Sequence, residues 1–259
     1  CIYCCYYNCR NLFIIGAQRS GSTLLAQALD LHPKINLMTP VAPEPKYFLE
    51  KNYNGKQAYI DLFKGQEKNY DYFLEKSVSY IEHDDALKRI YSDFPDARVL
   101  IILRNPIDRC LSNYRYSVEN GMEKREFLEA TQNLDRSDFN INISVNPFLY
   151  VERGFYDVYI KKVMNIFKNK NIKIIIFEEF ISSSENLNNI FEWLNLEKID
   201  LASNIFLEKV NQTRSLDLDP SVLNYLAPQY IESIVRLEHL LGDKICIWRQ
   251  ALKKQGIEL

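Results

Sequence analysis

A turn near the amino terminus combines residue types that proteins use to hold a phosphate group. An apolar run ends at Gly16, and Ser22 and Thr23 open a predicted helix. The spacing from Gly16 to Gly21 matches the start of a P-loop, G-x-x-x-x-G-K-[ST], whose backbone N–H groups cradle an anion. The lysine that a P-loop places next is Ser22 here, and Arg19 is the cation of the turn. The pattern predicts a site for a phosphorylated donor other than a nucleoside triphosphate.

A second group of cationic and hydroxyl residues follows a later apolar run. Residues 98–103 are typical of a buried strand, and Pro106 fits the first turn of the next helix. Arg109 and Ser112 are three residues apart on that helix and share a face, and Arg104 at its start can point to the same anion. A guanidinium donates two hydrogen bonds to a phosphate and a hydroxyl adds another. The segment therefore predicts a second phosphate site.

The two segments resemble the donor site of sulfotransferases that use 3′-phosphoadenosine 5′-phosphosulfate (PAPS). Arg19-Ser20-Gly21-Ser22-Thr23 is similar to their 5′-phosphosulfate loop, in the Arg form seen in some carbohydrate sulfotransferases. Residues 104–114 match their 3′-phosphate signature, R-[DN]-P-x-x-R-x-x-S-x-Y, at every position. The resemblance implies that PAPS is the donor, that adenosine 3′,5′-bisphosphate (PAP) is the product, and that both are bound by Arg19, Ser20, Gly21, Ser22, Thr23, Arg104, Arg109 and Ser112.

Two further segments are similar to those of heparan-sulfate-type sulfotransferases. Glu44-Pro-Lys-Tyr-Phe48 resembles an E-x-x-[FY]-F segment, and Glu75-Lys-Ser-Val-Ser-Tyr80 resembles E-K-[ST]-x-x-Y. The resemblance implies that Glu44 takes the proton from the acceptor and that Lys76 steadies the sulfuryl oxygens. General-base help of this kind is typically worth ~10²–10⁴-fold in rate.

The implied reaction is in-line transfer of a sulfuryl group to a hydroxyl or amine, catalysed by positioning and charge stabilisation with no metal required. Arg19 would stabilise the negative charge on the bridging oxygen that leaves. Asn211-Gln-Thr-Arg214 looks like the late loop that closes on the donor, so Arg214 joins the binding residues, although Ser215-Leu216 replaces the Gly and aromatic residue usual there. Residues 38–45 and 135–147 are irregular and could shape an acceptor cleft. The acceptor, a small molecule or a carbohydrate, stays open because these motifs are donor-side.

Other readings of the site need different residues. A nucleotide or small-molecule kinase would need a P-loop Lys where Ser22 stands, and a Mg²⁺-binding Asp where the strand ends in Arg104. A regulatory protein that binds the donor without catalysis is a third class, and the implied base and lysine argue against it. His32 and His83 are alternative bases.

Strands and helices alternate along the chain in the way that a phosphate-binding sheet requires. Apolar runs predict strands at 12–15, 98–103 and 172–177. Helices are predicted at 22–31, 55–63, 84–94, 106–120, 123–131, 154–167, 185–194 and 220–241. This order predicts an α/β, P-loop-like three-layer fold, with a central, mostly parallel sheet flanked by helices. Ligands on such sheets bind at the carboxyl ends of the strands, where both phosphate turns follow.

Composition bounds the remaining possibilities. The 259 residues predict a cysteine-rich segment at 1–10 and a single domain at 11–259. A net charge of -2 offers no basic excess for nucleic acid, and no apolar run reaches the ~20 residues of a membrane span. Four cysteines lie within residues 1–9, which leaves little chain to wrap a zinc ion. Scattered cysteines without a disulfide framework predict a reducing, cytoplasmic compartment.

Overall fold

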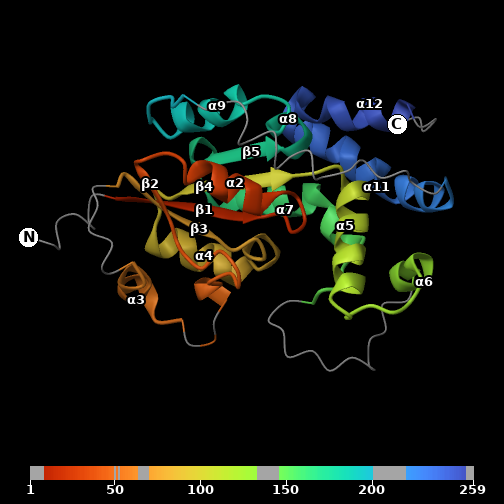
Figure 1. The fold of residues 1–259 in the computed structure, drawn as a ribbon, viewed down its shortest axis with the longest axis horizontal. Helices are drawn as coiled ribbons and strands as arrows, with labels where there is room; N and C mark the ends of the chain where they lie inside the picture. Colours follow the sequence, from red (N-terminus) through yellow and green to blue (C-terminus); the bar gives the residue numbers. More distant parts are fainter. Residues whose placement is uncertain are drawn as a thin grey trace, which may run out of the picture.

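A parallel five-stranded sheet forms the centre of the protein. The computed structural model describes residues 9–49, 51, 53–63, 70–132, 146–200 and 220–254. The strands are β1 (Arg10–Gly16), β2 (Ile35–Leu37), β3 (Tyr72–Lys76), β4 (Arg98–Leu103) and β5 (Ile172–Ile176). They lie in the order β2-β3-β1-β4-β5, and every pairing between neighbours is parallel (Figure 1). This confirms the predicted fold class.

Both faces of the sheet are buried, which explains why its central strands read as continuous apolar runs. In β1, Leu12 and Ile14 point into one cluster of buried side chains, and Phe13 and Ile15 point into the other. All four are fully buried. Burying each such side chain contributes roughly 1.5–3 kcal/mol to folding. A shift of one residue in register would exchange the two sets, so this alternation fixes how the strand sits.

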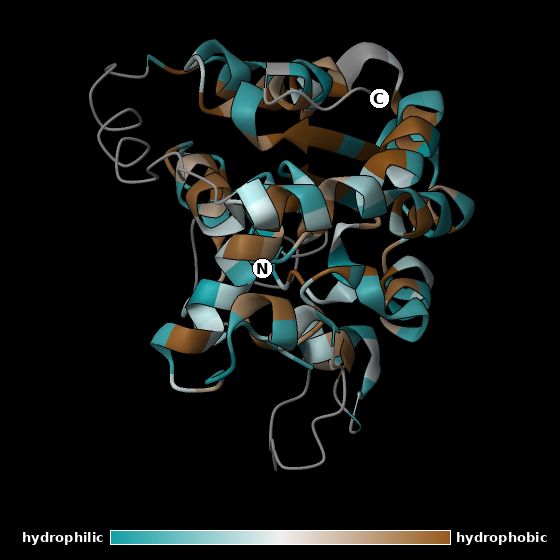
Figure 2. Ribbon diagram, turned by 90° about the vertical axis from the view of Figure 1, so that its right-hand side faces the viewer, coloured by the Kyte–Doolittle hydropathy of each residue, from teal (hydrophilic) through white to brown (hydrophobic). Residues whose placement is uncertain are grey.

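Helices cover the two faces unequally. The first cluster is closed by α2 (Ser22–Leu29), α8 (Phe177–Phe180) and α9 (Glu185–Trp193). The second cluster receives buried side chains from α3 (Gly55–Asp61), α4 (Asp84–Asp93), α5 (Pro106–Glu119), α6 (Phe127–Gln132), α7 (Tyr156–Ile166), α11 (Pro220–Leu241) and α12 (Cys246–Lys254). Hydrophilic and hydrophobic residues alternate along these helices, as expected of helices that bury one side (Figure 2).

The strands point their carboxyl ends toward one side of the molecule, where α5 stands (Figure 1). β1 and β4 are neighbours, and the two predicted phosphate turns follow them directly. The turn after β3 lies at the same edge, because β3 pairs with β1 on its other side. The fold therefore brings together three chain segments that lie far apart in the sequence.

Most predicted elements are confirmed within a few residues, and five are not as expected. Four of them, β2, β3, α8 and α12, were not predicted, and the helix expected from residue 123 begins at Phe127. Glu123 lies before the helix, and its carboxylate accepts hydrogen bonds from the backbone N–H groups of Lys124 and Arg125, each at 3.0 Å. The predicted domain boundary falls one residue inside β1, which starts at Arg10, and residues 1–8 lie outside the described ranges.

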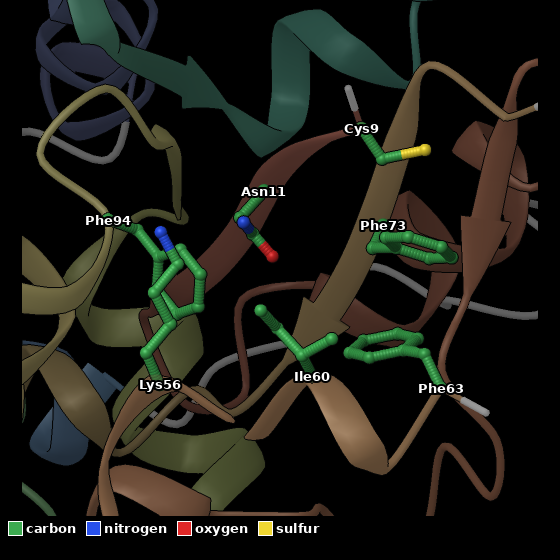
Figure 3. A pocket seen from close by; sticks show the side chains of 7 residues that line it. All are labelled: Cys9, Asn11, Lys56, Ile60, Phe63, Phe73 and Phe94. Carbon is green, nitrogen blue, oxygen red and sulfur yellow. The ribbon is translucent and has the colours of Figure 1, made fainter. Parts of the chain in front are cut away.

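A small pocket lies at the opposite edge of the sheet, where β1 and β3 begin (Figure 3). Its lining residues are Cys9, Asn11, Lys56, Ile60, Phe63, Phe73 and Phe94. The Lys56 ammonium lies 5.1 Å from the centre of the Phe94 ring, and Cys9 Sγ donates to the Tyr70 carbonyl at 2.7 Å. Since the phosphate turns follow the other ends of the strands, this pocket is separate from them.

Candidate active site

The turn between β1 and α2 has the backbone shape of an anion cradle. Gly21 has φ 88°, a left-handed conformation that favours glycine. A Cβ atom there would lie 2.4 Å from the Phe177 ring, so no other residue fits without a shift. The first hydrogen bond of α2 runs from Leu25 N to the Gly21 carbonyl at 3.0 Å. The N–H groups before Leu25, including those of Ser22 and Thr23, therefore have no earlier helical carbonyl and can face a bound anion.

Arg19 joins the two predicted phosphate motifs. Its Nε donates to Ser112 Oγ at 3.4 Å, across 93 residues of sequence. Its guanidinium also lies 4.5 Å from the centre of the Tyr116 ring. Burial lowers the pKa of Arg19, and the positive charges of Arg104 and Arg109 lower it further. Arg19, Arg104 and Arg109 repel one another near the carboxyl ends of β1 and β4. A bound anion would reduce this repulsion.

Phe177, the first residue of α8, packs between the two phosphate turns. The Arg104 guanidinium lies 5.2 Å from the centre of the Phe177 ring, and the same ring fills the space next to Gly21. Phe177 is therefore in a position to set the spacing between the backbone of the first turn and the cation of the second.

The turn at Arg104 and Asn105 is held by two side chains, and a third side chain holds one of them. Glu178 Oε1 accepts from Asn105 N at 2.8 Å, and Glu178 Oε2 accepts from Trp248 Nε1 at 2.9 Å. Tyr156 OH donates to the Arg104 carbonyl at 2.8 Å. The sequence patterns assigned no role to Tyr156 or Glu178. No sequence pattern singled out Trp248.

The structure corrects the prediction for Arg109. Its side chain is 0% exposed, and its guanidinium donates to Asn113 Oδ1 at 3.2 Å and to the Tyr150 carbonyl. A spacing of three residues puts Arg109 and Ser112 on neighbouring positions of α5, but the spacing does not say which of them faces inward. Arg109 faces the core and makes its hydrogen bonds there. Its positive charge still lowers the pKa of Arg19.

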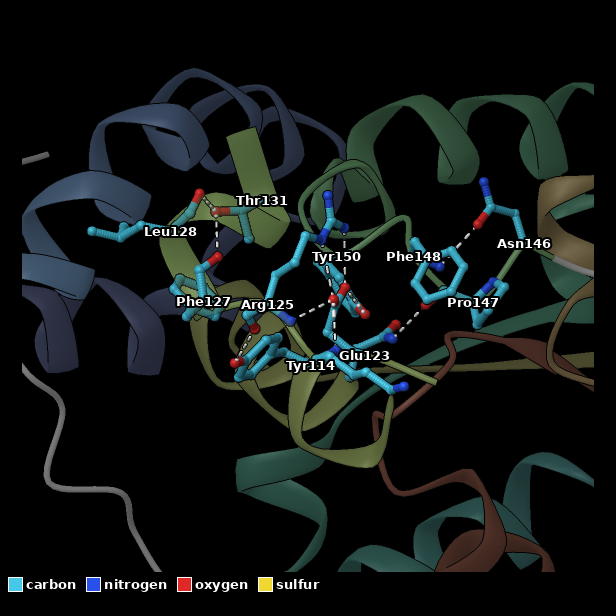
Figure 4. A network of polar contacts seen from close by, with 12 residues as sticks. Tyr114, Glu123, Arg125, Phe127, Leu128, Thr131, Asn146, Pro147, Phe148 and Tyr150 are labelled. Carbon is cyan, nitrogen blue, oxygen red and sulfur yellow. Dashed lines mark hydrogen bonds and ion pairs between the residues drawn. The ribbon is translucent and has the colours of Figure 1, made fainter. Parts of the chain in front are cut away.

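Tyr150 belongs to a polar network that supports this end of α5 (Figure 4). The Glu123 carboxylate accepts from Arg125 Nε, Arg125 Nη2 and Tyr150 OH, each at 3.1 Å. Asn113 Nδ2 donates to the Pro147 carbonyl at 2.9 Å. The Asn113 bond holds Pro147, at the carboxyl end of the irregular stretch predicted to shape an acceptor cleft. Residues 133–145 lie outside the described ranges.

The predicted base and lysine form an ion pair. Lys76 Nζ lies 2.6 Å from Glu44 Oε1, and Glu44 Oε2 accepts from Val78 N at 3.2 Å. The Lys76 side chain is only 6% exposed, and the Glu44 side chain is 14% exposed. Lys76 pairs in register with Ile14 of β1, two residues before Gly16. The pair therefore lies next to the first phosphate turn.

The remaining predicted residues divide into three groups. Thr23 is exposed and Ser112 is half-buried at the site, whereas Arg214 lies outside the described residues. His32 is a core residue, because its ring nitrogens bond to the Glu197 carbonyl and the Lys34 N–H. His83 stands at the start of α4.

Within the described ranges, no three or more His, Cys, Asp or Glu side chains are grouped so that they could hold a metal ion. None of the helices in those ranges combines the length and the apolar character needed to cross a bilayer.

Curated proteins are similar to this chain in sequence. A curated "Bifunctional heparan sulfate N-deacetylase/N-sulfotransferase 1" of Caenorhabditis elegans is 37% identical over 119 residues, which are 44% of this chain and 14% of that protein. The protein of the same name in Caenorhabditis briggsae is 26% identical over 205 residues, 75% of this chain and 24% of its own length. The chain thus spans less than a quarter of either relative.

Solved structures share the fold of this chain. A sulfotransferase from Alicyclobacillus acidocaldarius superposes with a TM-score of 0.75 and 25% identity, over 93% of this chain and 98% of that one. Mouse sulfotransferase SULT7A1, complexed with PAP, shares the fold with a TM-score of 0.51 at 15% identity, over 83% and 72% of the two chains. A family model described as "Sulfotransferase family" matches residues 36–200. Because this match covers more than half of the 259 residues, the chain belongs to the sulfotransferase family.

Proposed function

We propose that this protein transfers the sulfuryl group of PAPS to an amine or hydroxyl of a carbohydrate or small-molecule acceptor. The observation that carries the proposal is the contact between Arg19 and Ser112, since it joins the two phosphate motifs into one site. The Glu44–Lys76 pair at the same sheet edge supplies a proton acceptor and a second cation.

The reaction follows from these positions. The lone pair of the acceptor nitrogen or oxygen attacks sulfur, and the bond between sulfur and the 5′-phosphate oxygen breaks. The electron pair of that bond stays on PAP, where Arg19 stabilises it. Glu44 takes the proton that the acceptor loses. The Lys76 ammonium has three donors, so it can turn one of them to a sulfuryl oxygen.

The names of the relatives favour a carbohydrate amine as the first acceptor to test. Two of them are heparan sulfate N-sulfotransferases, and the mouse neighbour was solved with PAP. A hydroxyl acceptor stays within the proposal because Glu44 can serve either group. The cytoplasmic compartment and the single-domain extent of residues 11–259 stay predictions.

Two measurements test the proposal. By calorimetry PAP should bind much more tightly than AMP, because a charged contact to the 3′-phosphate is worth ~2–5 kcal/mol, and ATP should bind weakly. Label from ³⁵S-PAPS should then pass to a glucosamine-terminated oligosaccharide, with its N-acetylated form as the matched control that lacks the amine. Equal affinities for PAP and AMP would exclude the donor site. Equal labelling of both forms would assign a hydroxyl acceptor, because N-acetylation leaves the hydroxyls unchanged.

A further inference from the structure

A second carboxylate lies beneath the Glu44–Lys76 pair, and the reaction does not use it. Successive residues of β3 face opposite ways, so Lys76 reaches Glu44 while Glu75 points into the protein. Glu75 is 0% exposed. Burying a carboxylate is costly unless it is well hydrogen-bonded, so its partners indicate what it does.

Glu75 orients two hydroxyl groups that hold a neighbouring main chain. Ser77 Oγ and Tyr80 OH both donate to Glu75 Oε1 at 2.6 Å. A hydroxyl has one proton, so each must present lone pairs in its other directions. Those lone pairs accept backbone N–H groups: Lys46 N to Ser77 Oγ at 3.0 Å, and Phe48 N to Tyr80 OH at 3.2 Å.

Both backbone groups belong to the segment that carries Glu44. The carboxylate of Glu44 is itself held on the same turn, by Lys76 Nζ and Val78 N. Packing of the Phe48 ring against Tyr80, with centroids 5.7 Å apart, supports the same alignment. Residues 44–48 are therefore attached to residues 75–80 through the main chain, a side-chain carboxylate and an aromatic contact.

We propose that Glu75 is a positioning residue, which acts through the hydroxyls of Ser77 and Tyr80 to fix the main chain that carries Glu44. The inference rests on the proposed function, because it assumes that Glu44 is the proton acceptor. It assigns a role to the Glu, the hydroxyl residue and the Tyr of the E-K-[ST]-x-x-Y segment, of which the reaction uses only the Lys.

The attachment can be tested without any acceptor. Ser77→Ala and Tyr80→Phe each remove one hydroxyl, so backbone N–H groups of residues 46 and 48 should exchange faster with deuterium in the free protein. Ser79→Ala is a matched control, because Ser79 is buried and its Oγ has no hydrogen-bond partner among the described residues. Tyr72→Phe is a second control, because its hydroxyl donates to the Leu194 carbonyl instead. Unchanged exchange over residues 44–49 in both test variants would overturn the proposal.

Turnover tests whether the attachment matters for catalysis. With labelled PAPS and the glucosamine-terminated oligosaccharide, Ser77→Ala and Tyr80→Phe should each lower kcat by ~10-fold to ~10²-fold, as expected for a misplaced catalytic group. The affinity for PAP should stay unchanged, and Glu75→Gln, which keeps an acceptor oxygen, should retain more activity than Glu75→Leu. Both controls should remain within about twofold of wild type, since their hydroxyls are not part of the attachment.

A double-variant comparison separates this inference from the proposed function. If Ser77 acts through Glu44, then Ser77→Ala should cost nothing further in a Glu44→Gln background. Wild-type turnover in Glu44→Gln would remove the base role itself, and with it the positioning role. A slow Glu44→Gln enzyme together with wild-type kcat in Ser77→Ala and Tyr80→Phe would overturn only the role of Glu75.

Discussion

Arg19 sits at the point where the two phosphate motifs meet, and its surroundings define its task. It contacts Ser112 and the Tyr116 ring, and the charges of Arg104 and Arg109 oppose its own. An anion that grows more negative as the sulfur–oxygen bond breaks gains most from a cation held in this way. The gain is larger in the transition state than in the bound donor.

We therefore expect Arg19→Ala to lower kcat more than it weakens PAP binding. Arg19→Lys should recover part of the rate, because it keeps the charge but loses the planar guanidinium. Single-turnover transfer from labelled PAPS and calorimetry with PAP measure the two effects. Equal losses in rate and affinity would show that Arg19 only binds the donor.

The buried carboxylate of Glu75 makes a prediction about pH. Burial raises the pKa of Glu75, and hydrogen bonds from Ser77 and Tyr80 offset part of that rise. The Glu44 charge, which faces it from the neighbouring segment, raises it further, and Tyr59 of α3 is the remaining titratable group against it. Folded Glu75 thus keeps its proton at a pH at which the unfolded chain has lost it. The stability from this group is complete below the ordinary Glu pKa and is lost as pH rises through the raised value.

The amide in Glu75→Gln cannot ionise, so this variant should not lose stability in this way as the pH rises. Free energies of unfolding, measured by urea at steps from about pH 4 to about pH 8, should show wild type falling relative to Glu75→Gln as the pH rises. A difference that is constant with pH would contradict the raised pKa.

Single residues also show what the sequence could and could not predict. Resemblance to family segments placed Glu44 and Lys76 at the site, and the structure pairs them. It also placed Arg109 at a phosphate, whereas Arg109 faces the core. The motif records which residue types occur together, and it does not distinguish a ligand from the buried cation beneath it. Only packing against Asn113 and Tyr150 makes that distinction.

At the scale of elements, the turn from β1 to α2 depends on a small residue and a large one. Gly21 adopts a left-handed conformation, and the Phe177 ring occupies the space that a side chain would need. Gly21→Ala therefore combines backbone strain of ~1–3 kcal/mol with a clash. We expect a lower melting temperature and weaker PAP binding.

A second variant separates the two causes. Phe177→Leu in the Gly21→Ala background should recover part of the stability if the clash matters, while the backbone strain remains. Thermal melting measures the stability of the two variants, and calorimetry measures their affinity for PAP. Full wild-type affinity in Gly21→Ala would mean that the turn does not need this conformation to hold the donor.

Elements were predictable where burial is continuous and hard to predict where it is not. β4 is an unbroken apolar run and was predicted with its observed bounds. β3 was not predicted, because its buried run ends in the charged residues Glu75 and Lys76. Lys76 is paired with Glu44, 32 residues earlier in the chain, and Glu75 accepts from hydroxyls of the turn that follows the strand. β2 has three residues, too few for a period to show. The charged residues Glu75 and Lys76 therefore prevented the prediction of β3, the strand that carries them.

At the scale of the whole molecule, the carboxy-terminal helix is connected to the donor site. α12 contributes Trp248, whose ring is almost fully buried and whose Nε1 bonds to Glu178. Glu178 holds Asn105 N, next to Arg104. The connection crosses from α12 through α8 to the turn after β4, and local sequence patterns could not show it because its members are far apart in the chain.

Trp248→Phe removes the indole N–H and leaves Glu178 Oε2 without that donor. A buried hydrogen bond to a charged group is worth ~1–3 kcal/mol, and part of this loss should reach the turn at Arg104, the proposed site of the 3′-phosphate. We expect PAP to bind up to ~10-fold more weakly, while AMP, which lacks that phosphate, binds as in wild type. Leu252→Ala is the matched control, because Leu252 is equally buried in α12 and its truncation removes packing without removing a hydrogen-bond donor.

Fluorescence provides a direct test of the connection, because the chain has two tryptophans. In Trp193→Phe the only indole is Trp248, one hydrogen bond from Glu178. Saturating PAP should change its emission, and AMP should change it less, because we expect Arg104 to contact the 3′-phosphate, which AMP lacks. The Leu252→Ala variant should lose stability and yet keep its preference for PAP over AMP. If Trp248→Phe keeps that preference and PAP leaves the emission unchanged, α12 supports the fold and does not act on the donor site.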